Sequence, residues 1–152
     1  VRLYDPAVGR AIMTAAFALR YDIALPARLV ELCVLETAKH DRSNFEWPGH
    51  ARRAKKLGFS DADILAIKEG THAPDLTEQE KLVRQVAREM LETRDLSDDT
   101  FARAERELGP TYLFDMVSVI GHYQHTALSL KVWRIPLRVG DVPAFPEAMD
   151  EK

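Results

Sequence analysis

The fold of this chain is constrained most by its helix start and stop signals, which divide nearly the whole length into short segments. Asp5-Pro6 begins the first segment, Thr77 and Glu80 form a capping box, and Gly109-Pro110 separates one helix from a long apolar one. Between these signals apolar residues recur every three or four positions, whereas the alternation typical of strands is nearly absent. The sequence therefore predicts an all-α protein.

The predicted architecture is a single-domain bundle of about six to seven helices. A length of 152 residues suits one domain that buries a real core. The expected helices run over about 6–21, 26–40, 44–58, 60–69, 77–93, 97–108 and 111–132. Residues 1–135 thus form the predicted helical domain, and the Pro-containing remainder, 136–152, is predicted to be an extended arm or tail.

Charge and cysteine content exclude several classes of function. A net charge of -3 leaves no dominant basic surface, so we expect no nucleic-acid partner. No apolar run approaches the roughly 20 residues that span a bilayer, and no signal-peptide pattern opens the chain, so we expect no membrane association and a cytoplasmic location. The single cysteine, Cys33, excludes an intramolecular disulfide and is expected to be a small buried hydrophobe.

Glu46 and His50 form the first candidate site, because residues four apart share one face of a helix. The pair could be a hydrogen bond at the helix start, half of a metal site, or an acid–base pair. Carboxylate-bridged metal sites in bundles use repeated Glu/His motifs on paired helices. The chain has no second copy of the motif, so we expect no metal, although His40, His72, His122 and His125 could add ligands.

Glu31 is the best single candidate for a functional residue. On a helical wheel it falls among Ala27, Val34, Leu35 and Ala38, inside the apolar stripe of its helix. A carboxylate buried there would have a raised pKa, which suits a general acid or base near neutral pH. The alternative is a buried structural pair with an Arg or Tyr from another helix.

At these residues the chain resembles the carboxymuconolactone decarboxylase-like family, which includes all-α proteins of the alkylhydroperoxidase D type. The matching stretch runs from Leu29-Val30-Glu31 through the segment 44–50 to 57–67, and a later Gly121-His122-Tyr123 element also matches. The resemblance implies a helical, usually oligomeric protein that acts on a small-molecule substrate, an organic acid or lactone, without a cofactor. Dimer, trimer and hexamer all remain open.

Residues and resemblance together suggest a proton-transfer site. We assign His50 as acid or base, Glu31 as its buried proton partner and Glu46 as the group that orients His50. Weaker candidates for substrate binding are Trp47, Tyr123 and Arg53, the last as an anion-binding group beside Glu46.

Two other functions are alternatives. The hydroperoxidase branch of the family carries a Cys-x2-Cys pair where this chain has Ser43 and Glu46, so a peroxidase would have to work without that dithiol. The third hypothesis is a non-catalytic, oligomeric ligand-binding protein in which the Glu and His residues only hold two helices together.

Overall fold

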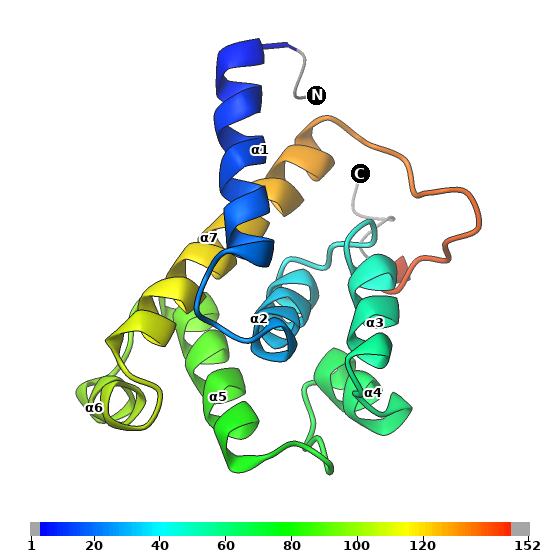
Figure 1. Ribbon diagram of the computed structural model, residues 1–152. Helices are drawn as coiled ribbons and strands as arrows, with labels where there is room; N and C mark the ends of the chain where they lie inside the picture. The colour runs from blue at the N-terminus through cyan, green and yellow to red at the C-terminus, as the bar shows by residue number, and fades with distance from the viewer. Residues whose placement is uncertain (1–3, 147–152) are drawn as a thin grey trace.

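Seven α-helices and no strand make up residues 4–146, the part of the chain that the computed structural model describes (Figure 1). The helices are α1 (Pro6–Tyr21), α2 (Ala27–His40), α3 (Trp47–Lys56), α4 (Asp61–Glu69), α5 (Glu78–Thr93), α6 (Asp98–Glu107) and α7 (Pro110–Val132). The all-α prediction is therefore confirmed.

Helix α2 forms the centre of the molecule. Every residue from 29 to 38 is buried, and the helix contacts α3 and α4 on one side and α5 and α7 on the other (Figure 1). Burial on all sides includes two carboxylates, Glu31 and Glu36. Arg84 of α5 donates a hydrogen bond to Glu36, since a buried charge needs a partner.

The predicted helix ends agree closely with the structure, because capping is a local interaction. Asp5, Ser60 and Ser97 accept hydrogen bonds from the first turns of their helices, and Thr77 and Glu80 make the reciprocal capping box. Gly58 has φ +90°, a left-handed conformation that suits glycine after a helix end.

Helix α3 starts three residues later than predicted. Residues 44–46 form a turn, and the first helical residue is Trp47 rather than Asn44. Two features of the chain explain the later start of α3. Pro48 lacks an N–H and is tolerated only in the first turn, while the side chain of Asn44 is bonded to the backbone of Phe145.

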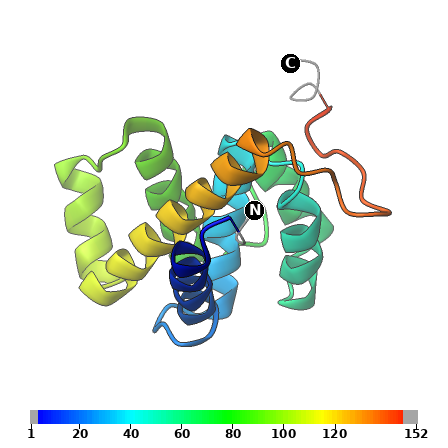
Figure 2. The same cartoon turned by 90° about the horizontal axis from the view of Figure 1, so that it is seen from above.

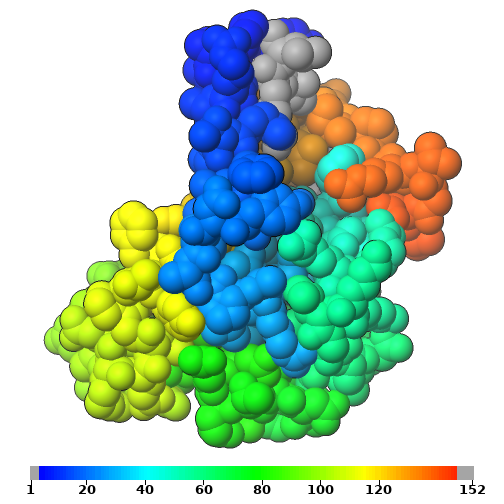
Figure 3. All heavy atoms as spheres, viewed as in Figure 1, coloured from blue at the N-terminus to red at the C-terminus, as the bar shows by residue number. Residues whose placement is uncertain are grey.

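Helix α1 projects from the body of the molecule, as the ribbon and the space-filling view both show (Figures 1 and 3). Gly9 is its only buried residue. The apolar side chains of Met13, Phe17 and Tyr21 are all largely exposed along it.

Residues 133–146, which we call the C-terminal segment, return to α3 after α7 ends. Figure 2 shows this segment leaving the end of α7 and passing over the α3 side of the bundle. Asn44 and Phe145 exchange two hydrogen bonds of 2.9 and 2.7 Å, and Arg52 is paired with Asp141 at 2.6 Å. The rest of the predicted arm, 147–152, lies outside the described residues.

Candidate active site

A cavity of about 620 Å³ lies where α1, the start of α3, α7 and the C-terminal segment meet. Its polar lining residues are Arg20, Tyr21, Glu46, His50, His122, Tyr123, Thr126 and Arg138. Apolar side chains from α1, α7 and the C-terminal segment complete the wall. The cavity therefore combines a hydrocarbon surface with a few convergent polar groups, as small-molecule sites do.

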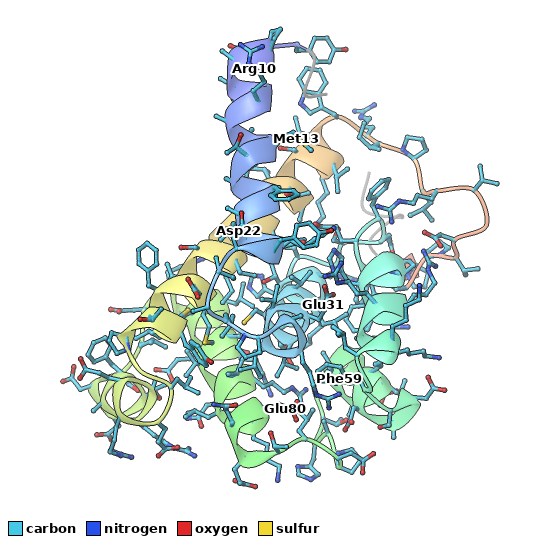
Figure 4. All side chains as sticks on the ribbon, in the orientation of Figure 1. Arg10, Met13, Asp22, Glu31, Phe59 and Glu80 are labelled. Atoms are coloured by element: carbon cyan, nitrogen blue, oxygen red, sulfur yellow. The ribbon has the colours of Figure 1, made fainter. Side chains whose placement is uncertain are left out.

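Glu31, His50 and Arg53 form one cluster of charged and polar side chains, of which His50 lines the cavity. Nδ1 of His50 lies 2.7 Å from one oxygen of Glu31, and Nε of Arg53 lies 2.7 Å from the other. Glu31 is 1% exposed, at the position that Figure 4 labels on α2. A hydrogen bond and an ion pair on one buried carboxylate offset the cost of its burial and fix its orientation.

The cluster changes two of the roles expected from sequence. Glu31, rather than Glu46, holds the imidazole ring of His50, because Nδ1 is the atom bonded to Glu31. Arg53 lies three residues after His50, so both reach the same carboxylate from one face of α3. Arg53 does not line the cavity, and its position does not support the anion-binding role expected for it.

Glu46 is the carboxyl group at the wall of the cavity. It is 4% exposed, and burial raises its pKa from 4.5 to about 7, although a hydrogen bond from Ser43 lowers it. Its oxygen Oε2 has no hydrogen-bond partner within the described residues, and the side chain does not cap α3. Glu46 is therefore a buried carboxyl group that lines the same cavity as His50.

Tyr123 links the far side of the cavity to His50. Its ring lies edge-on to the His50 ring, with centroids 5.0 Å apart, and Arg20 donates a 2.6 Å hydrogen bond to its hydroxyl. Burial raises the pKa of Tyr123, while Arg20 acts in the opposite direction. Tyr123 therefore lines the cavity next to His50.

Arg20 and Arg138 are cavity residues that sequence reasoning missed. Arg20 stands in the last turn of α1 and Arg138 in the C-terminal segment. No local sequence pattern identifies either arginine as a cavity residue. Each reaches the site only because segments about a hundred residues apart in sequence pack together.

Trp47 is not part of the cavity lining. Its ring packs edge-on against Phe145 at 5.4 Å and is 5% exposed. The structure thus places Trp47 under the C-terminal segment, and its position does not support the substrate-binding role suggested for it.

Cys33 lies inside the core, as expected. It is fully buried, and burial together with the nearby charge of Glu36 raises its pKa to about 12. Over residues 4–146 no group of three or more His, Cys, Asp or Glu side chains is arranged to hold a metal ion. None of the helices found there has the length and apolar character needed to cross a membrane.

Comparison with known proteins agrees with the fold. The model of the carboxymuconolactone decarboxylase family matches residues 6–89, more than half of the chain. The crystal structure of a protein of unknown function from Agrobacterium tumefaciens, described as a candidate antioxidant defence protein AhpD, superposes with a TM-score of 0.79. The two chains are 17% identical over 90% of this chain and 94% of that one, which shows a shared fold. No curated protein sequence matches the chain significantly.

Proposed function

Because the chain belongs to the carboxymuconolactone decarboxylase family, we propose that it is an enzyme that carries out acid–base chemistry, a decarboxylation or a proton transfer, on a small organic acid or lactone without a cofactor. The observation that carries this proposal is Glu46, a buried carboxyl group with a pKa of about 7 at the wall of a cavity that also presents His50. A general acid works best when its pKa lies near the working pH.

In this proposal Glu46 supplies the proton. During a decarboxylation the bond between the substrate and the departing carboxylate breaks, carbon dioxide leaves, and the electron pair stays on the substrate as an enolate. Glu46 protonates the enolate carbon, and water then returns a proton to Glu46. The Nδ1 atom of His50 is bonded to Glu31, so Nε2 is the ring nitrogen left to polarise the substrate or accept a proton.

The test is turnover of a panel of lactone acids by Glu46→Gln and His50→Ala. We expect each variant to lose between about 10²- and 10⁴-fold in kcat/KM, the usual contribution of general acid–base catalysis. Glu105→Gln is the matched control, because Glu105 is an exposed carboxylate far along the chain on α6. Unchanged turnover in both site variants would refute the proposal.

The pH dependence provides an independent check. A general acid must be protonated to act, so the activity of the wild type should fall as the pH rises through about 7, the pKa of Glu46. The Glu46→Gln variant should lack this decline.

Thiol-dependent peroxide reduction, the alternative activity, has less support from the site. Ser43 and Glu46 stand where the hydroperoxidase relatives carry cysteines. The buried Cys33 keeps its proton at neutral pH, and a protonated thiol is a poor nucleophile.

We also propose that the protein acts as a homo-oligomer. Exposed apolar side chains follow both α1 and α7: Val8, Met13, Phe17 and Tyr21 on the first, and Phe114, Val117, Leu128 and Val132 on the second. Apolar surface of this extent is typical of a protein interface. Light scattering after size exclusion should give a multiple of 17.2 kDa, and a monomer would contradict the proposal.

A further inference from the structure

We propose that Arg138, in the C-terminal segment, binds a carboxylate of the substrate and makes the enzyme selective for anionic substrates. The inference rests on the proposed function in so far as the same cavity is the substrate site. It assigns a role to a residue that lies outside 6–89, the part of the chain matched by the family.

The guanidinium of Arg138 is held at the cavity wall with most of its donors free for a ligand. It lies over the ring of Phe45, 4.2 Å from the centroid, and lines the cavity together with Glu46 and His50. Within the described residues it donates one hydrogen bond, a long one of 3.4 Å to the carbonyl of Phe45. An arginine has five N–H donors, so a ligand can be bound without breaking an existing ion pair.

Gly49 leaves the space that the guanidinium of Arg138 occupies next to α3. A Cβ atom built at Gly49 would lie 2.9 Å from Nη1 of Arg138, closer than a real Cβ comes to another atom. The absence of a side chain there lets the cation approach the first turn of α3, one residue before His50. The segment that carries Arg138 is fixed on α3 by the Arg52–Asp141 pair and by Phe145.

The other two arginines near the site are held by shorter contacts than the 3.4 Å hydrogen bond of Arg138. Arg53 is paired with the buried Glu31, and Arg20 donates to the hydroxyl of Tyr123. Arg138 is therefore the arginine best placed to pair with an incoming anion. A carboxylate is its natural complement, because two of its oxygens match two parallel N–H groups of a guanidinium.

This arrangement defines the class of substrate. A small carboxylate would place its charged end at Arg138 and its hydrocarbon body against the apolar wall, with the reacting carbon near Glu46 and His50. In a decarboxylation, the carboxylate bound by Arg138 stays on the substrate and a second carboxylate leaves, because the ion pair stabilises the bound one in its charged form.

The test compares binding of a carboxylate with binding of its neutral ester. The probes are γ-butyrolactone-γ-carboxylic acid and its methyl ester, titrated calorimetrically at low ionic strength into the wild type and Arg138→Gln. We expect the wild type to prefer the acid and the variant to lose at least about tenfold in affinity for it, equivalent to about 1.4 kcal/mol, with the ester unaffected. Equal binding of acid and ester by the wild type, or an unchanged affinity in the variant, would overturn the inference.

Arg134→Gln is the matched control, because it removes the same charge from an exposed residue of the same segment that does not line the cavity. It should leave the preference for the acid intact. If Arg134→Gln lowers the affinity for the acid as much as Arg138→Gln does, the loss is caused by the change in net charge and the inference fails.

Gly49→Ala tests whether the space at Gly49 positions the guanidinium of Arg138. The added methyl group should displace the guanidinium, while Ala in place of Gly favours the helix, so acid binding should weaken without loss of thermal stability. Combined with Arg138→Gln, it should cause no additional loss. Additive effects of the two substitutions would contradict the inference.

Because binding is measured without turnover, the two proposals can fail separately. Loss of acid binding in Arg138→Gln together with normal turnover in Glu46→Gln and His50→Ala would refute the proposed function alone. Turnover that depends on Glu46 and His50, with acid affinity independent of Arg138, would refute this inference alone.

Discussion

Replacing Glu46 by Gln should make the protein more stable, and the gain should depend on pH. In the folded protein burial raises the pKa of Glu46 from 4.5 to about 7, because the charged form is poorly solvated there. The unfolded chain has no such burial. Glu46 therefore costs stability when it is ionised, and Gln removes the charge while keeping the shape of the side chain.

The sign and size follow from proton linkage. Between pH 4.5 and about 7 the folded state holds more protons on Glu46 than the unfolded state, so the free energy of unfolding falls as the pH rises through this range. One pKa unit corresponds to 1.36 kcal/mol, which makes the full cost about 3 kcal/mol above pH 7. For a chain of this length that is roughly 6–12 °C in Tm.

Urea denaturation of the wild type and Glu46→Gln from pH 4 to 8 measures the effect. The difference in free energy of unfolding should be smallest at the acid end, rise by about 1.4 kcal/mol per pH unit, and level off above pH 7. Other titrating groups are common to both proteins and cancel in the difference. A difference that does not change with pH would refute the reasoning.

Glu31→Gln is the matched comparison, because it also neutralises a buried carboxyl group. Glu31 is hydrogen-bonded to His50 and forms an ion pair with Arg53, whereas one oxygen of Glu46 has no partner within residues 4–146. Breaking this buried ion pair should lower the free energy of unfolding by about 3–5 kcal/mol at pH 7. The two substitutions should thus act in opposite directions.

Three further outcomes are expected. The thiol of Cys33 should react with Ellman's reagent only after unfolding, and Cys33→Ala should leave any peroxide consumption unchanged; fast reaction of the native protein would contradict its burial. Phe145→Ala should lower the free energy of unfolding by about 3 kcal/mol and shift the fluorescence of Trp47 to longer wavelength, so an unchanged spectrum would argue against that packing. Tyr123→Phe should cost about 1 kcal/mol in chemical denaturation through the lost Arg20 bond, and no loss would mean that water replaces it fully.

The sequence by itself determined the all-α fold and most of the helix ends, the start of α3 being the exception. Caps such as Ser60 and the Thr77–Glu80 box act between residues three apart, so they can be recognised without knowledge of the rest of the chain. Burial of Glu31 was also predictable, because its neighbours on the helix face are apolar.

The tertiary structure alone decided which groups meet at the site. His50 could have been held by Glu46, four residues away on the same helix face, yet Glu31 of the neighbouring helix holds it. Arg20 reaches Tyr123 across 103 residues of sequence, and Arg138 reaches Phe45 across 93. The physical reason is range: caps and apolar stripes operate within a turn or two of helix, whereas the pairing of polar side chains depends on how separate helices pack.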